Sequence, residues 1–480
     1  MNNFQELGSN DNHILAECYF VNLSSVDLFI LVLYIIAIIS IGWIAARKVK
    51  TLDDFATGGR HYTTFFITAT LASSFIGGGF TTGLAEKVYS LGLIYIIALW
   101  GFSLKEILVA KYIAPKMVIF PSAHSVGDIM GQLYGRRAKI FTGISAFLVC
   151  AGILGAQLMA FGHICNVLLG ISSHFGAFIC ALIIMTYAGA GGMRAVVAND
   201  TLHFCVLMIS LPLVFYFGTQ AIGGFEKLYF YSSMNFSNNI SYSSIALIFL
   251  SFFFGETLVP PYVQRLLIGK TIKDTIKGNM ASGLLSIPFF LMIGLIGIIA
   301  VTMNPNLNPN LALPYVVLES MPTGLKGLAI AGMMAIILSS ADSFLNAASV
   351  SITHDVLTPI IPRLTQAQKL LISKYSTYVV ALSGLLFTLS LESAIDILLE
   401  AYMFWTPIIL VPFVAGVMGV QRPKKAFLYG AITGISVVTV IRLLSLKHSA
   451  YFEISIWGIL ANFIVFFGYR PMPNFSRNSV

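Results

Sequence analysis

Long apolar runs separated by short polar loops dominate the chain. A helix needs about 20 apolar residues to cross the hydrocarbon core of a bilayer. Thirteen segments meet that need and are predicted to be transmembrane helices: 26–46, 64–90, 91–113, 139–168, 172–192, 197–222, 241–262, 279–303, 326–352, 370–391, 396–420, 426–444 and 451–468. The longest interruptions, 114–138, 223–240 and 304–325, leave no room for a globular domain. The pattern therefore predicts an all-α polytopic membrane protein.

Positive charge predicts the orientation of these helices, because cytoplasmic loops carry an excess of Lys and Arg. With the N-terminus outside, the inner loops and the C-terminal tail hold 22 of the 28 basic residues, Arg265 among them. The outer loops hold only Lys227, Lys326 and Lys447. We therefore expect an outside N-terminus, a cytoplasmic C-terminus and an odd number of spans. The first 25 residues lack an apolar signal-peptide core, so the first span is expected to serve as an uncleaved anchor.

Composition agrees with a protein embedded in the lipid bilayer. Apolar residues make up 57% of the chain and charged residues only 10%, against about 25% in soluble domains. The net charge of +8 is spread between the apolar spans, which argues against nucleic acid as a partner. The sequence contains no CxxC pair or His/Cys cluster, so neither a zinc site nor a disulfide framework is predicted. We see no nucleophile–base pair, and we expect neither an enzyme nor a cofactor beyond a coupling ion.

A polar stripe runs through the apolar segment 326–352, in "AIILSSADSFLNAAS". Residues three, four and seven apart share one face of a helix, and Ser339, Asp342, Ser343 and Asn346 have that spacing. Ser340 lies about 100° to one side. Hydroxyl and carboxylate oxygens suit a small hard cation. The alternative is helix packing through small residues, which we favour for Ser349 and Ser351 but not for Asp342.

Two other spans carry sequences that interrupt a helix. Gly77, Gly78 and Gly79 stand in the middle of segment 64–90, and each weakens a helix by about 1 kcal/mol relative to Ala. Segment 241–262 contains Pro260 and Pro261, with Glu256 at membrane depth before them. The alternatives are close helix packing and a simple kink. Breaks at corresponding places in two repeats are the pattern expected of an inverted-repeat secondary transporter.

Asp200, in "VVANDTLHF", lies just inside the start of segment 197–222. Two interpretations stay open for it. The carboxylate could cap the helix N-terminus, or it could belong to an ion site, because charges at membrane depth usually mark ion or substrate paths.

The breaks and spans suggest five segments of the chain. Residues 1–25 are an extracellular N-terminal segment, and residues 26–63 are the first helix with its cytoplasmic loop. Residues 64–222 and 223–420 are two inverted-repeat units, each opening on its broken helix. Residues 421–480 hold two peripheral helices and a cytoplasmic tail.

Four motifs resemble the sodium:solute symporter family: "DDFATGGRHYTTFFITATLASSFIGGG", "GGMRAVVANDTLHF", "PYVQRLL" and "MMAIILSSADSFLNAASVSITHDVL". The resemblance covers about residues 26–420 and implies a LeuT-like five-plus-five inverted repeat. The motifs look nearest to the high-affinity choline transporter branch. That branch encloses its quaternary ammonium with aromatic residues. Phe75 and Val259 stand where two Trp residues of that cage would be, and Gln157 faces it from the fourth span, which argues against choline itself.

The resemblance also implies an Na⁺ site, carried over position by position. Backbone carbonyls of Ser73, Ile76 and Ile336 and the hydroxyls of Ser339 and Ser340 would bind the ion. A second site in some relatives matches the positions Asp200, Ser339, Asp342 and Ser343. Because Asp342 adds a second carboxylate, a second Na⁺ is expected there, and a proton is the alternative.

The sequence thus predicts Na⁺-driven uptake of a small polar solute by alternating access, in the plasma membrane (the inner membrane of a bacterium), by a monomer. The solute is expected at the two breaks, with residues of both breaks and of the fourth span around it: Phe75, Gly77, Gly78, Gly79, Phe80, Gln157, Phe161, Glu256 and Val259. Proton-coupled symport and a transport-inactive sensor remain alternatives. A channel would favour symmetric rings of pore-lining charges, which this chain lacks.

Overall fold

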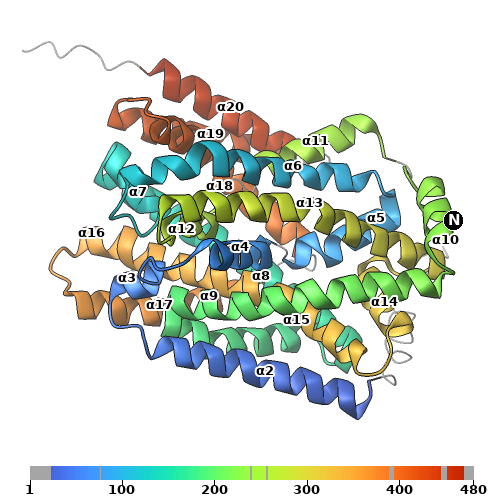
Figure 1. The fold of residues 1–480 in the computed structure, drawn as a ribbon. Helices are drawn as coiled ribbons and strands as arrows, with labels where there is room; N and C mark the ends of the chain where they lie inside the picture. The colour runs from blue at the N-terminus through green and yellow to red at the C-terminus, as the bar shows by residue number, and fades with distance from the viewer. Residues whose placement is uncertain are drawn as a thin grey trace, which may run out of the picture.

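The computed structural model describes residues 23–75, 77–237, 240–255, 258–388, 394–444 and 451–469. Nearly all of these residues are helical (Figure 1). The first half contains α2 (Ser25–Ala46), α3 (Leu52–Thr57), α4 (Thr64–Phe75), η1 (Gly78–Phe80), α5 (Thr82–Leu91), α6 (Tyr95–Leu108), η2 (Val109–Ile113), η3 (Ala114–Ile119), α7 (Val126–Tyr134), α8 (Arg136–Leu169), α9 (Ser173–Ala221) and α10 (Phe225–Met234). The second half contains α11 (Tyr242–Phe254), α12 (Pro260–Leu267), α13 (Ile272–Met303), η4 (Pro309–Leu311), α14 (Ala312–Ser320), α15 (Leu325–Val350), η5 (Ser351–Leu357), α16 (Thr358–Ile360), α17 (Gln366–Thr388), α18 (Ala394–Val417), α19 (Lys424–Leu444) and α20 (Tyr451–Gly468).

The described helices confirm a multi-pass architecture, although the count of thirteen spans stays a prediction. Seven helices are long and apolar enough to cross a membrane, and the broken pair α4 and α5, bent by 76°, makes an eighth. The predicted spans 172–192 and 197–222 run on as α9, and Gly192 between them has φ 49° and ψ −143°. The chain therefore turns at Gly192, where a side chain would be strained.

Helix α15 is the centre of the bundle. All of its residues except Leu325 and Leu328 are buried, and it packs against α2, α4, α8, α9 and α17. Small residues permit these close approaches, since a Cβ at Gly332 would lie 2.1 Å from Ser210 Oγ. Such packing of small residues is typical of helices in membranes. The polar stripe of α15 therefore faces protein on every side.

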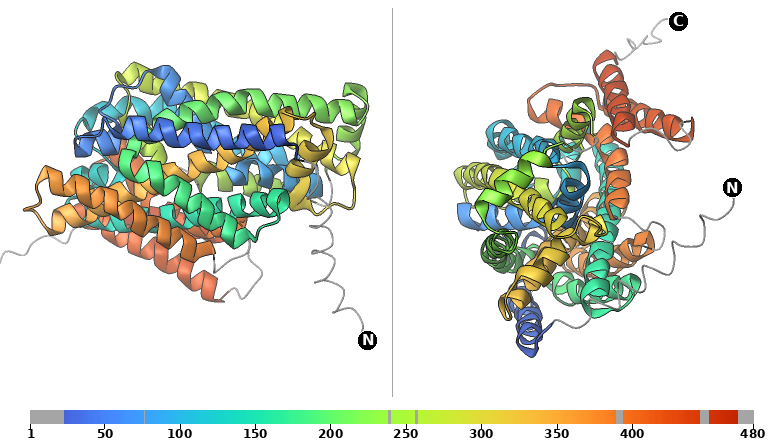
Figure 2. Two further views of the ribbon diagram at one scale, coloured as in Figure 1. Left: turned by 90° about the horizontal axis from the view of Figure 1, so that it is seen from below. Right: turned by 90° about the vertical axis from the view of Figure 1, so that its right-hand side faces the viewer.

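The first and last helices lie on opposite sides of the bundle (Figures 1 and 2). A capping box starts α2, in which Ser24 Oγ accepts from Asp27 N and Asp27 Oδ2 accepts from Ser24 N. Asp27 Oδ1 also accepts from the backbone of Gly324 and Gly327, at 2.8 Å and 2.7 Å. The side chain that caps α2 thus also holds the start of α15.

The segment between α2 and α4 contains the short helix α3, which is anchored to α9. Thr51 caps α3, and Arg194 of α9 pairs with Asp54 at 2.6 Å. Burial raises the pKa of Asp54, but hydrogen bonds from Arg194 and from the backbone of Lys50 hold that pKa below its ordinary value. This loop is thereby tied to the helix that carries Asp200.

Candidate ion and solute site

The predicted break in the second span is confirmed. Helix α4 ends at Phe75, a short 3₁₀ turn follows at Gly78–Phe80, and α5 begins at Thr82. A Cβ at Gly77 would lie 2.7 Å from Ser340 Oγ, and one at Gly78 would lie 3.0 Å from Ala160 Cβ. The glycines therefore let the broken segment approach both α15 and α8. Gly79 is half-buried in the same turn, and Ile76 lies outside the described residues.

Helix α15 meets this break through Ser340. Its hydroxyl donates to the backbone carbonyl of Ser74, with Oγ and O 2.6 Å apart. The last four carbonyls of a helix lack intrahelical donors, and in α4 these include Ser73 and Ser74. Ser73, Ser340 and Ile336 are buried, and Ile336 lies one turn before Ser340 on α15. The structure therefore brings the predicted hydroxyl to the carbonyl end of α4, in a buried site.

The other hydroxyl of the pair, Ser339, faces a different group. It donates to Asp200 Oδ1, while Thr70 of α4 donates to Asp200 Oδ2. Asp200 is fully buried inside α9, eight residues past the turn at Gly192. A helix N-cap must lie at the helix start, so that interpretation of Asp200 is wrong. The two adjacent serines thus connect α15 to both the break and Asp200.

Arg265 completes this cluster, and the sequence analysis misplaced it in a cytoplasmic loop. It lies in α12 with a side chain that is 0% exposed, and its Nη2 is 3.3 Å from Asp200 Oδ2. The same nitrogen donates to Ser343 Oγ and, at 3.3 Å, to Ser74 Oγ. Because a buried charge needs a partner, Arg265 folds inward to Asp200, although Lys270 in the loop and Lys273 in the first turn of α13 are exposed.

Asp342 is a second buried carboxylate in the same stripe. Tyr187 of α9 donates to its Oδ2 at 3.0 Å, and Ser343 Oγ lies 3.4 Å from its Oδ1. The structure therefore brings the predicted residues Asp200, Ser339, Asp342 and Ser343 together. Thr70, Ser74 and Tyr187 were missed as partners. Thr70 and Ser74 are four residues apart on one helical face, a spacing that the sequence displays, whereas nothing near Tyr187 distinguishes it.

Asn346 and Ser349 end the stripe in different ways. Both are fully buried. Ser349 Oγ donates to the carbonyl of Asn346 within α15, at 2.9 Å, as a residue in a packing role does. The side-chain amide of Asn346 has no hydrogen-bond partner among the described residues. An unpartnered buried amide is costly, so this position suits a water molecule.

The second predicted break lies between α11 and α12. Helix α11 ends at Phe254, and α12 starts at Pro260. Pro260 and Pro261 occupy the first turn of α12, where the missing N–H groups cost no hydrogen bond. They start a helix rather than kink one. Leu258 has φ 57°, rare for a residue with a side chain, and Val259 is buried. Glu256 lies outside the described residues.

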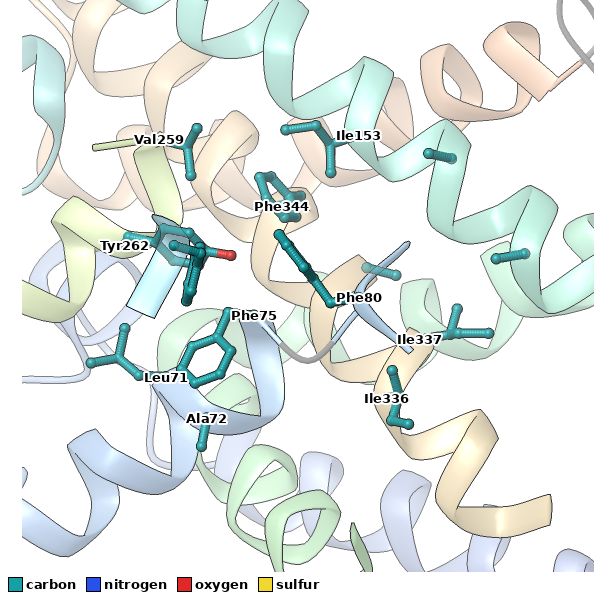
Figure 3. Close-up of a cluster of buried hydrophobic side chains, with 14 of the residues drawn as sticks. Leu71, Ala72, Phe75, Phe80, Ile153, Val259, Tyr262, Ile336, Ile337 and Phe344 are labelled. Carbon is teal, nitrogen blue, oxygen red and sulfur yellow. The ribbon is translucent and has the colours of Figure 1, made fainter. Parts of the chain in front are cut away.

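The candidate solute walls lie around the first break. Gln157 of α8 accepts from the backbone N of Gly78 at 3.0 Å, and Phe161 is buried one turn further along α8. Figure 3 shows Phe75, Phe80, Val259 and Phe344 gathered around the broken segments. Phe75 and Phe80 both pack against Phe102, with ring centroids 4.9 Å and 5.3 Å apart.

A cavity of about 650 Å³ lies beside the second break. It is lined by apolar residues of α6, α11, α18 and α20, and Leu258 and Lys105 stand at its inner wall. The ion-binding candidates do not line it. This apolar cavity is therefore distinct from the polar stripe.

Comparisons with known proteins agree with this arrangement. The sodium:solute symporter family model matches residues 55–437. Sodium/glucose cotransporter 4 of Danio rerio is 24% identical, over 88% of this chain and 72% of its own length. The sodium/sialic acid symporter NanT of Aliivibrio fischeri is 25% identical, over 93% of this chain and 92% of its own.

Solved structures show the same fold. A Na⁺-coupled sialic acid symporter in a substrate-bound outward-open state has a TM-score of 0.82 at 19% identity, covering 93% of this chain and 98% of its own. A nucleobase-cation-symport-1 family transporter has a TM-score of 0.57 at 12% identity, covering 85% and 92%. The predicted LeuT-like fold and Na⁺-coupled symport of a solute are confirmed at the level of the family, whereas the nearer likeness to the choline branch stays a prediction. With its two broken helices and a family match that spans most of its length, the chain belongs to the sodium:solute symporter family.

Proposed function

We propose that this protein takes up a small polar organic solute together with Na⁺, by alternating access. The observation that carries the proposal is the hydrogen bond of Ser340 to the carbonyl of Ser74, at the carbonyl end of α4. Na⁺ would bind there between the carbonyls of Ser73, Ile76 and Ile336 and the hydroxyls of Ser339 and Ser340. Hard oxygen ligands suit Na⁺ as they suit other hard cations. An ion at this junction stabilises the contact of α4 with α15.

The buried charges favour a second cation near Asp342. Asp200 and Asp342 are two carboxylates, and Arg265 supplies one positive charge. The imbalance leaves one negative charge at membrane depth, which costs several kcal/mol unless a cation neutralises it. We propose that Asp342 and Ser343, with Asp200 and Ser339 beside them, hold that second cation. Na⁺ and a proton both satisfy the charge balance, so proton coupling is the second candidate.

The solute would lie between the two breaks. Gly77, Gly78, Gly79, Phe75 and Phe80 would contact it from the first break, and Glu256 and Val259 from the second. Gln157 and Phe161 would form the wall on α8. The relatives above are named for glucose and sialic acid, and a polar solute rich in donors fits the amide of Gln157. Movement of one helix group against the other then opens the site to the inside.

The free energy released by the entry of one Na⁺ is enough to accumulate the solute strongly. A single charge crossing 100 mV supplies about 2.3 kcal/mol, and a tenfold Na⁺ gradient adds about 1.4 kcal/mol. Together these sustain an accumulation of several hundredfold, at roughly 1.4 kcal/mol per decade. We propose that the chain works as a monomer in the plasma membrane, with its N-terminus outside and its C-terminus in the cytoplasm.

The proposal is tested by a thermal-shift screen for the solute, followed by an assay of solute uptake. Purified protein is heated with a panel of sugars, amino acids, carboxylates and vitamins, in Na⁺ and in choline buffer. A solute that raises the melting temperature only in Na⁺ is then tested for uptake into proteoliposomes, with Na⁺ and pH varied separately. Na⁺-dependent uptake at fixed pH supports the proposal. Uptake driven by a pH gradient, and unchanged when choline replaces Na⁺, favours proton coupling instead.

A further inference from the structure

At one end of the bundle, three side chains from two distant parts of the chain converge on one point. His124 precedes α7, Asp128 lies in α7, and His354 lies in η5, which continues α15. One ligand atom from each lies within 4.8 Å of those of the other two. No zinc site was predicted, because the sequence shows no CxxC pair or His/Cys cluster, and His124 and His354 are far apart along the chain. The fold brings them together by packing α7 against η5.

The ligand atoms of this cluster converge on Asp128 Oδ2. Asp128 Oδ2 lies 2.7 Å from His354 Nε2 and 3.4 Å from His124 Nδ1. His124 Nδ1 is buried without a hydrogen-bond partner in the described part of the chain. In a tetrahedral site with bonds near 2.0 Å, ligand atoms lie about 3.3 Å apart. His124 Nδ1 thus stands close to the distance that an ion beside Asp128 Oδ2 requires, whereas His354 Nε2 is at hydrogen-bond distance from that oxygen and must move outward when an ion binds.

The surrounding residues support the same chemistry. A metal-bound His usually gives its other ring nitrogen to a carboxylate, and His124 Nε2 lies 3.2 Å from Asp53 Oδ1. Lys139 pairs with the other oxygen of Asp128, Oδ1, while Oδ2 faces the two imidazoles and accepts from the backbone N of His124 at 2.9 Å. The three candidate ligands are 11% to 20% exposed. An ion can therefore reach them from solvent.

We propose that His124, Asp128 and His354 bind a divalent transition-metal ion of the zinc class, with water in the fourth position. Two imidazoles and one carboxylate form a ligand set that such ions prefer over Mg²⁺ or Ca²⁺. The ion joins the segment before α7 to η5, the continuation of the helix that carries Ser340. Arg60 also donates to the carbonyl of Ala123 at 2.7 Å. The metal therefore braces the loop entering α4 against the end of α15, on the side that the proposed orientation makes cytoplasmic.

The test is calorimetric titration of ZnCl₂ into the full-length protein in detergent, after removal of any affinity tag and stripping with EDTA. One zinc ion per chain is expected, and MgCl₂ should give no heat of binding. His124→Ala and His354→Ala should each weaken zinc binding by at least about tenfold. His61→Ala is the matched control, since this exposed His lies in the same loop region outside the cluster, and it should leave affinity unchanged.

Asp53→Asn provides a variant that keeps all three ligands. It should weaken zinc binding by about tenfold, because it removes only the carboxylate that orients His124. The inference is overturned if wild-type protein binds no zinc, or if both His→Ala variants bind it as tightly as His61→Ala. Na⁺ binding measured on the same samples separates this result from the proposed function, because Na⁺ binding requires none of these three ligands.

Discussion

Ser340 Oγ donates to the carbonyl of Ser74 across 2.6 Å, and so joins the central helix α15 to the end of the broken helix α4. The contact exists because α4 stops at Phe75 and leaves its last carbonyls without helical donors. The hydroxyl of Ser340 and the carbonyls at the end of α4 together supply hard oxygen ligands at membrane depth. The mechanism that we propose depends on this junction.

Gly77→Ala should weaken Na⁺ binding. A Cβ here would lie 2.7 Å from Ser340 Oγ, so the Ser340 hydroxyl must turn away from the break and the ion loses that ligand. We expect the Na⁺ concentration for half-maximal binding to rise by about tenfold, equal to about 1.4 kcal/mol. Radioactive Na⁺ binding to purified protein measures this.

Gly468→Ala is the control for that substitution. A Cβ at Gly468 meets nothing within 4 Å, so its Na⁺ binding should equal that of the wild type. If Gly77→Ala also bound Na⁺ normally, the break would tolerate a side chain, and close approach would not explain the glycine.

Arg265 and Asp200 should show strong coupling in stability. Removing one partner of a buried ion pair costs about 3–5 kcal/mol, because the other charge stays buried and unpaired. We therefore expect Arg265→Gln and Asp200→Asn each to lower the melting temperature sharply. The double variant should melt at a higher temperature than either single variant, as measured by fluorescence-detected size exclusion after heating. Additive losses would argue against a direct pair.

The sequence predicts the features of this site that depend on local patterns, but not those that depend on contacts between distant residues. The glycine triplet, the proline pair and the stripe on α15 are local patterns, so they predict both breaks and the face of the helix that carries Ser339 and Asp342. The partner of a side chain is not local. Arg265 looks like a loop residue by charge counting, and only the folded structure shows that the side chain of α12 meets Asp200 of α9.

The same limit explains the two serines. Ser339 and Ser340 are adjacent in the sequence and were predicted to bind one ion as a pair. Because adjacent residues are about 100° apart around a helix, Ser339 points toward Asp200 and Ser340 toward Ser74. The cluster of His124 and His354 is a further case, since helix packing alone brings the two residues together. The turn at Gly192, with φ 49°, falls at the predicted boundary between spans 172–192 and 197–222, but no local pattern shows that the two spans run on as the single helix α9.

Asp342→Asn should change how Na⁺ binding responds to a second cation. If that cation is Na⁺, the Hill coefficient for Na⁺ should fall to about one. If it is a proton, Na⁺ binding in the variant should lose the pH dependence of the wild type. Tyr187→Phe keeps the carboxylate and removes only its hydrogen bond, so it should retain either behaviour. An Asp342→Asn protein with unchanged cooperativity and unchanged pH dependence would remove the basis for a second ion.

The most direct measurement is the binding of radioactive Na⁺ to purified Ser340→Ala protein, with Ser349→Ala beside it. Both residues are buried serines of α15, but Ser349 Oγ bonds only to its own helix, at Asn346. The account predicts that Ser340→Ala raises the Na⁺ concentration for half-maximal binding by about tenfold or more, while Ser349→Ala stays close to the wild type. Equal effects of the two substitutions, or wild-type Na⁺ binding in Ser340→Ala, would contradict a sodium site at the junction of α4 and α15.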